Sequence, residues 1–91
     1  MSATAGAGRV VSAGEQGAYG LTVVVEHDNG VQTRYAHLSA IGVRPGEEIA
    51  AGTVVGRVGQ SGRATGPHLH FEVLVNGRRV DPALVAQAAS P

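Results

Sequence analysis

The sequence predicts a small, glycine-rich all-β fold, either an antiparallel sheet or a barrel-sandwich hybrid. Three observations support this class. The 14 glycines separate short valine-rich runs, β-branched residues favour strands, and Asn-Gly pairs typical of tight hairpin turns recur between the runs. With 91 residues, 43% of them apolar and 15% charged, the chain is at most one domain and has the composition of a chain that packs.

The strands are expected to alternate with turns along the chain. Asp28-Asn29-Gly30 supplies residues that tolerate positive φ and predicts a hairpin, and Asn76-Gly77 predicts a second one. Asp81 and Pro82 can cap a short helix that runs to Gln87. We expect a loose Ala/Gly-rich start at 1–8, a folded domain at 9–82 and a tail at 83–91, with strands at 9–13, 21–27, 31–37, 48–50, 53–58, 68–75 and 78–80 and a loop at 60–67.

Composition excludes several classes of function. Seven basic residues, all arginine, balance seven acidic ones, which argues against a nucleic-acid partner. No cysteine is present, so any metal must be held by His, Asp or Glu, and the absence of lysine excludes a carrier lysine, a Schiff base and a P-loop. No apolar run approaches the roughly 18 to 20 residues that span a bilayer, and residues 1–8 lack the apolar core of a signal peptide, so membrane insertion is not expected.

The segment GPHLHFE, residues 66–72, carries the most chemical information. Alternate side chains of a strand share a face, which would place His68, His70 and Glu72 together and Phe71 on the opposite side. An H-x-H pair is a weak zinc signal by itself, and two surface histidines on a strand are an equal alternative. By the same period Tyr35 and His37 would share a face at the end of the strand 31–37, where His37 could equally cap a turn or face solvent.

Several segments together resemble the lysostaphin-like, or LytM-type, zinc metallopeptidases that cut peptidoglycan cross-bridges. The resemblance covers residues 9–82 and includes most of the motifs that typify the family. The matching segments are YGLTVVVEHDNG at 19–30, TRYAHLS at 33–39, the glycine-spaced barrel segment at 43–59, SGRATGPHLHFE at 61–72 and the NG to DP ending at 76–82.

This resemblance implies a duplicated-hybrid-motif fold, a zinc cofactor and a peptidoglycan stem or cross-bridge peptide as substrate. It makes His70 a zinc ligand, and it makes His37 and His68 the histidines that activate water or stabilise the oxyanion, since imidazoles can accept a proton or donate to developing charge. Glu72 would orient an imidazole or, more simply, face solvent, and Tyr35 would lie in the second shell or the substrate groove. The family also implies a location in the cell envelope, outside the cytoplasmic membrane.

The sequence departs from the family at its start. Family members bind zinc with a further His and Asp from an H-x-x-x-D motif early in the domain, and residues 1–8 contain neither residue type. We therefore expect one of three protein zinc ligands here, and a domain that lacks its N-terminal segment. An upstream segment, a partner chain or a homo-oligomer would complete the sheet, whose open edges otherwise invite pairing.

Two other interpretations are compatible with the sequence. One is a metal site rebuilt around His27 and Asp28, which the resemblance places in a hairpin turn. The other is a non-catalytic LytM-type domain that binds cell wall or regulates another hydrolase, although the retained His37, His68 and His70 count against it. A hybrid-barrel carrier domain is excluded because the chain has no lysine to carry a group.

Overall fold

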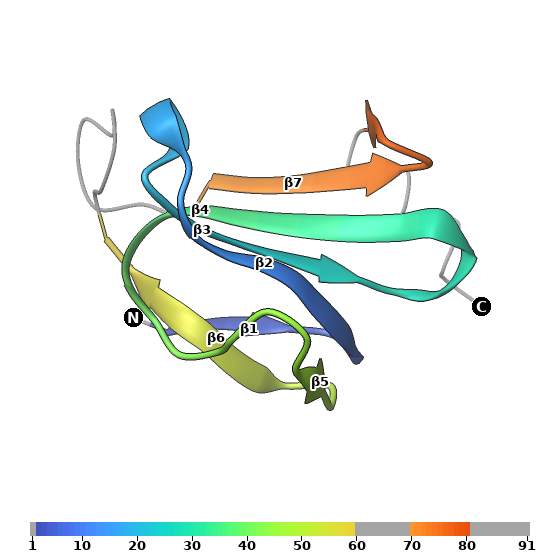
Figure 1. Ribbon diagram of the computed structural model, residues 1–91, viewed down its shortest axis with the longest axis horizontal. Helices are drawn as coiled ribbons and strands as arrows, with labels where there is room; N and C mark the ends of the chain where they lie inside the picture. The colour runs from blue at the N-terminus through green and yellow to red at the C-terminus, as the bar shows by residue number, and fades with distance from the viewer. Residues whose placement is uncertain (1, 60–69, 81–91) are drawn as a thin grey trace.

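The computed structural model of the protein describes residues 2–59 and 70–80 (Figure 1). The predicted loop at 60–67, the start of the predicted strand at 68 and 69, and the predicted C-terminal helix lie outside the described residues. Eight strands and two 3₁₀ turns make up the described part: β1 Ser2–Ala5, β2 Gly8–Glu15, η1 Gly17–Tyr19, β3 Leu21–Glu26, η2 Asp28–Gly30, β4 Val31–Ile41, β5 Glu48–Ile49, β6 Thr53–Val58, β7 His70–Val75 and β8 Arg78–Val80.

All eight strands pair antiparallel, which confirms the predicted all-β class. The strand order is β1-β6-β4-β3-β2-β5, and β7 pairs with β4 and with β8. Both predicted hairpins form at residues that adopt left-handed backbone: Asn29 and Gly30 have φ values of 63° and 74°, and Asn76 and Gly77 have values of 52° and 84°. Turn chemistry visible in the sequence therefore fixes the β3–β4 and β7–β8 connections.

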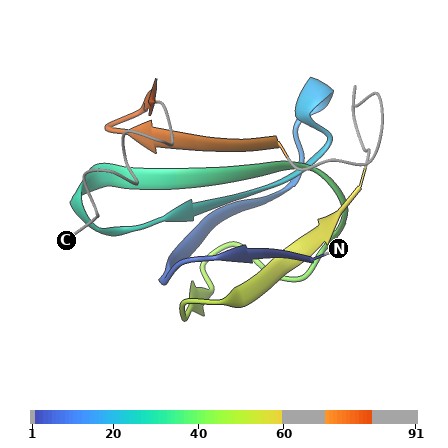
Figure 2. The ribbon, with the colours of Figure 1, turned by 180° about the vertical axis from the view of Figure 1, so that it is seen from behind.

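The sheet folds over on itself, so that β1, β5 and β6 cross beneath β2, β3 and β4 (Figures 1 and 2). The core fills the space between these two parts of the sheet. Leu38, Val10, Val23, Val25 and Val55 are all fully buried there, because valines at alternate positions of a strand point to the same side. Around them pack Ala3, Ala5, Tyr35, Val43 and Ile49.

Strand β4 is the centre of the architecture because it has three partners. β3 lies along one side of it, while the other side pairs first with β7, through residues 31–36, and then with β6, through residues 38–41. The strand was expected to end at 37, but it continues to Ile41. The change of partner falls at His37, whose φ is 58°.

Strand β1 is the main difference from the sequence-based expectation of a loose start. It pairs with β6 from Ser2 opposite Arg57 to Ala5 opposite Thr53, and Ala3 and Ala5 are buried in the core. Alanine has low strand propensity, so this segment gives little strand signal in the sequence. Its small side chains fit where β1 and β6 cross beneath the rest of the sheet.

The outer strands of the sheet are short. β5 has two residues, β8 has three and β1 has four, which limits the unpaired backbone that each presents for pairing with another chain. A backbone bond from the Gly52 N–H to the Ala5 carbonyl, 2.8 Å long, further ties β1 to the turn between β5 and β6. Within residues 2–59 and 70–80, no helix has the length and apolar character to cross a membrane.

Candidate active site

Two of the three candidate histidines are brought together by the register of β4 and β7. The Cα of His70 pairs with that of Ala36, so position 70 lies beside the residue that precedes His37. Ala36 and His70 are 34 residues apart in the sequence, and only the antiparallel pairing places them side by side. His68 lies outside the described residues, and for His70 the structure describes the backbone.

His37 occupies a bulge in β4. Tyr35 pairs with Val23 and Leu38 pairs with Leu21, so two residues of β4, Ala36 and His37, face the single residue between them on β3. Left-handed backbone is rare in residues other than glycine, and when it occurs within a strand it redirects the side chain.

The bulge overturns the expectation that Tyr35 and His37 share a face. Tyr35 and Leu38 are both buried in the core although they are three positions apart, an odd number that would place them on opposite faces of a regular strand. His37 itself is half-buried. The extra residue thus turns His37 out of the core face while the strand on both sides of it stays anchored.

The backbone at His37 is held from the β6 side as well. The carbonyl of His37 accepts a hydrogen bond of 3.2 Å from the N–H of Gly59, the residue that follows β6. A Cβ added at Gly59 would lie 2.4 Å from the Cβ of Ser39, so only glycine fits at this approach. The close approach of these two segments fixes the position of His37.

Glu72 is buried, in contrast to the expectation that it faces solvent. It is only 5% exposed. Its Oε1 accepts a hydrogen bond from Arg34 Nη1 at 2.7 Å, and its Oε2 accepts one from Arg79 Nη1 at 3.0 Å. Burying an unpaired carboxylate costs free energy because the charge loses its contact with water. Here two guanidinium groups donate charged hydrogen bonds to Glu72 and offset that cost.

Sequence analysis missed Arg34, Arg79 and Tyr19, which form a cluster with Glu72 (the Arg34–Glu72–Arg79 cluster). The Arg34 guanidinium carbon lies 5.0 Å from the centre of the Tyr19 ring, a cation–π contact, and the Tyr19 hydroxyl lies 3.5 Å from Glu72 Oε2. Arg34 is directly opposite Glu72 in the pairing of β4 with β7. Strand alternation predicts only which face a residue lies on. The partners of Glu72 depend on the register of β4 and β7, which the sequence does not show.

Tyr35 lies in the core instead of a substrate groove. It is 3% exposed, and its ring packs against Phe71 with the centroids 5.4 Å apart and the planes tilted by 51°. Its hydroxyl lies 2.8 Å from Thr33 Oγ1. Burial raises the pKa of Tyr35 above its ordinary 10.0, although the hydrogen bond to Thr33 acts in the opposite direction. Phe71 itself is 41% exposed, so the side of β7 opposite Glu72 is only partly covered.

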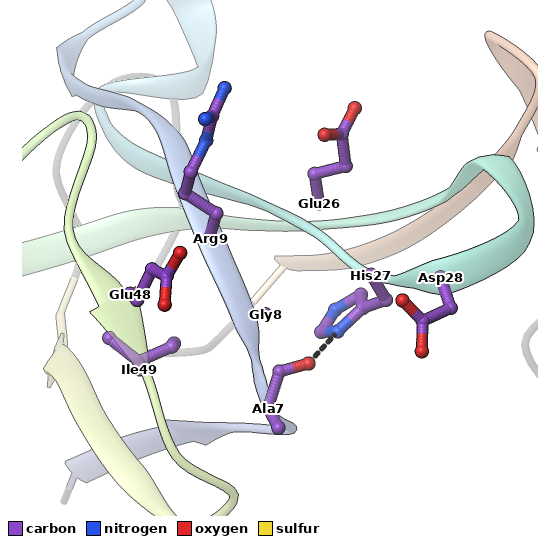
Figure 3. Close-up of a pocket in the computed structure, with 8 residues that line it drawn as sticks. All are labelled: Ala7, Gly8, Arg9, Glu26, His27, Asp28, Glu48 and Ile49. Carbon is purple, nitrogen blue, oxygen red and sulfur yellow. Dashed lines mark hydrogen bonds between the residues drawn. The ribbon is translucent and has the colours of Figure 1, made fainter.

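A separate open hollow of about 460 Å³ lies between the start of β2, the end of β3 and β5 (Figure 3). Its lining residue Glu26 pairs with Gln32 of β4, which is four residues, or about 14 Å at the usual rise of a strand, from Ala36. The hollow is therefore distinct from the histidine site. Its lining consists of Ala7, Gly8, Arg9, Glu26, His27, Asp28, Glu48 and Ile49.

The structure argues against a metal site rebuilt at His27 and Asp28. His27 Nδ1 lies 2.7 Å from the Ala7 carbonyl oxygen, as Figure 3 shows, and Nε2 lies 2.8 Å from Thr33 Oγ1. A carbonyl can only accept, so Nδ1 carries the proton and Nε2 accepts from the Thr33 hydroxyl in the neutral ring. Both nitrogens are thus occupied, and His27 connects the β1–β2 turn to β4.

The side chains that the structure describes do not by themselves form a complete metal site. Over residues 2–59 and 70–80, no group of three His, Cys, Asp or Glu residues lies close enough to hold a metal ion. His70, whose backbone the pairing of β4 with β7 sets beside Ala36, nonetheless carries an imidazole, a donor type that zinc prefers. One residue with a donor of this type therefore lies at the start of β7.

Comparison with known proteins identifies the class. The model of Peptidase family M23 matches residues 3–82, and the chain belongs to this family. The resemblance inferred from the motifs at 19–82 is thereby confirmed.

Relatives and solved structures agree with this family. The chain is 48% identical over 79 residues to DD-carboxypeptidase/endopeptidase Mpg of Neisseria meningitidis, covering 87% of this chain and 18% of that protein. It is 45% identical over 78 residues to peptidoglycan DD-endopeptidase ShyA of Vibrio cholerae, covering 86% and 18%. A crystal structure of a zinc-containing peptidase from Vibrio cholerae superposes with a TM-score of 0.81 at 41% identity, covering 88% of this chain and 26% of that one. The chain spans about a fifth of the length of these two relatives.

Proposed function

We propose that these 91 residues form part of a zinc-dependent endopeptidase that hydrolyses peptide cross-links of bacterial peptidoglycan in the cell envelope. The observation that carries this proposal is the pairing of Ala36 with His70, which sets His37 beside a second histidine position of the family motif. The names of the two relatives, a DD-carboxypeptidase/endopeptidase and a peptidoglycan DD-endopeptidase, support this substrate class.

His70 is the proposed zinc ligand within this chain. The printed sequence contains no H-x-x-x-D motif, so we propose that the remaining ligands come from a segment or partner chain outside these 91 residues. The zinc-containing peptidase of similar structure supports the choice of metal. When bound, zinc acts as a Lewis acid that polarises the scissile carbonyl and makes water a stronger nucleophile.

His37 and His68 are the proposed proton-handling groups. A histidine beside the scissile bond can take a proton from the attacking water or donate a hydrogen bond to the oxyanion, because its ordinary pKa lies near neutral pH. The bulge and the bond from Gly59 hold the His37 backbone in one place, which favours this role since catalytic groups must be positioned to within a fraction of an ångström.

Glu72 and Tyr35 have supporting roles in this proposal. Glu72 binds two arginines and stabilises the β4–β7 pair that carries His70, while Tyr35 anchors β4 in the core just before the bulge. Neither side chain is assigned to the chemical step.

The test uses the full product of the reading frame that carries these residues, supplied with zinc and cross-linked muropeptides. We expect dimeric muropeptides to become monomers in chromatography coupled to mass spectrometry. His37→Ala, His68→Ala and His70→Ala should each lower the rate by at least about 100-fold, while Arg44→Gln, on the exposed loop after β4, should cleave normally. Intact cross-links with the unmodified protein would contradict the proposal, and would favour a domain that binds or regulates without cleaving.

A further inference from the structure

The Arg34–Glu72–Arg79 cluster carries a surplus positive charge. Two guanidinium groups surround one carboxylate, for a net charge of +1, and together they have ten N–H donors against the two oxygens of Glu72. Arg34 Nε is buried without a hydrogen-bond partner in the described part of the chain. The cluster therefore has more capacity to donate hydrogen bonds than its own carboxylate can use.

The cluster lies next to the candidate active site. Glu72 follows position 70 by two residues on β7, which is one strand repeat of about 6.6 Å, and Arg34 precedes Ala36 by the same spacing on β4. Arg79 reaches the cluster from β8, where it pairs with Leu74. Because its Nη1 bonds to Glu72, the guanidinium of Arg79 lies about one strand repeat from position 70, near a group bound beside His70.

The parts of the cluster differ in exposure. The Glu72 and Arg34 side chains are 6% and 23% exposed, and the Tyr19 ring covers the Arg34 guanidinium. The Arg79 side chain is 68% exposed and bonds to Glu72 through Nη1. Arg34 and Glu72 thus form a fixed base, and Arg79 presents the rest of its guanidinium to solvent.

We propose that Arg79, held by Glu72, binds a free carboxylate of the substrate peptide close to the bond that is cleaved. This inference rests on the proposed function and adds a specificity-determining residue to it. A guanidinium binds a carboxylate through two parallel hydrogen bonds, which gives both affinity and orientation. Arg34 adds positive charge beneath the ligand while Glu72 prevents Arg79 from turning away.

The chemistry of one relative supports a carboxylate at this distance. A carboxypeptidase, as the Neisseria relative is named, removes a residue that bears a free carboxylate. That group is one residue from the scissile bond, about 3.3 to 3.6 Å along an extended peptide. Such a carboxylate would lie between position 70 and the cluster, within reach of Arg79.

The test measures binding of two peptides by calorimetry to the full product of the reading frame, with zinc present. The probes are an acetylated tripeptide that ends in D-Ala-D-Ala with a free carboxylate and the same peptide as its C-terminal amide. We expect the acid to bind about ten-fold more tightly than the amide, since a charged hydrogen-bond pair is lost in the amide.

Arg79→Gln should abolish this preference for the acid while leaving the binding of the amide unchanged. Arg78→Gln is the matched control, because it removes the same charge from the adjacent exposed position of β8, which faces the other side of the strand. If Arg79 had only a structural role, its loss would weaken the binding of both peptides equally. The ratio of the two affinities would then not change.

Three outcomes would overturn the inference. The unmodified protein could bind the acid and amide equally, or Arg79→Gln could keep the preference, and either result would leave the proposed function standing if muropeptides are still cleaved. If neither peptide binds and cross-links also stay intact, the carboxylate site and the proposed function fail together.

Discussion

The guanidinium of Arg34 and the carboxylate of Glu72 lie 2.7 Å apart, directly opposite each other on β4 and β7. This pair joins the strand that carries His37 to the strand that carries His70. Glu72 is one strand repeat from His70, and Arg34 is one strand repeat from Ala36, the residue that precedes His37, so the ion pair and the alignment of the two histidine positions depend on the same register.

Glu72→Gln should therefore lower the free energy of unfolding by about 2 kcal/mol, because it leaves the partly buried Arg34 without its counter-charge. Urea denaturation measures this. Glu26→Gln, at an exposed position of β3, is the matched control and should change the stability by less than about 0.5 kcal/mol. Equal stability of Glu72→Gln and the unmodified protein would show that the ion pair does not support the sheet.

Thr33 links two hydrogen bonds, one to His27 Nε2 and one to the Tyr35 hydroxyl. Thr33→Val should cost about 2 kcal/mol in unfolding free energy, since it leaves the buried Tyr35 hydroxyl without this partner. Combined with Tyr35→Phe, it should cost less than the sum of the two single changes by about 1 kcal/mol. Additive costs in this double-mutant cycle would mean that the two side chains do not act together.

Stability should fall at alkaline pH because of Tyr35. Its pKa in the folded protein is raised by burial above the ordinary 10.0, so the protonated phenol stabilises the fold fully below pH 10.0. This contribution is lost as the pH rises through the folded pKa. Unfolding free energies measured from about pH 8 to about pH 11 should decline for the unmodified protein and decline less for Tyr35→Phe. Parallel curves for the two proteins would contradict this assignment.

The left-handed backbone at His37 predicts an unusual order of stability between two substitutions. In an ordinary strand, glycine is less stable than alanine by roughly 0.5 to 1 kcal/mol. At a φ of 58° alanine carries the left-handed strain, so His37→Gly should instead be more stable than His37→Ala by about 0.5 to 1 kcal/mol. Thermal unfolding compares the two, and a more stable His37→Ala would argue against the bulge.

The sequence predicted the hairpins and most strands because their signals are local. Asn29-Gly30 and Asn76-Gly77 tolerate positive φ at the positions that the turns require, and both turns form as expected. Strand β1 was missed because Ser2–Ala5 has no strand signal of its own and is stabilised by pairing with β6. The length of β4 was missed because only a few per cent of residues other than glycine have positive φ, and the enrichment of histidine among them is too weak a signal to mark His37.

The candidate site was predicted less completely than the fold. Motif resemblance located His37 and the segment that contains His68 and His70, but strand period alone could not reveal what covers each face. The burial of Glu72 was not predicted because its partners, Arg34 and Arg79, lie on other strands. They meet Glu72 only through the register of the folded sheet. Tyr35 was misplaced for the same reason as His37, since a bulge breaks the two-residue period on which the expectation relied.

Calorimetric titration of the full product of the reading frame with zinc tests most directly the central claim that His70 is a zinc ligand. The account predicts about one zinc per chain with a Kd of about 1 μM or tighter, lost in His70→Ala. Binding should persist in His27→Gln, because both nitrogens of His27 are occupied by Ala7 and Thr33. Absence of zinc binding, or equal binding by His70→Ala, would contradict the assignment of His70 as a metal ligand and with it the proposed peptidase site.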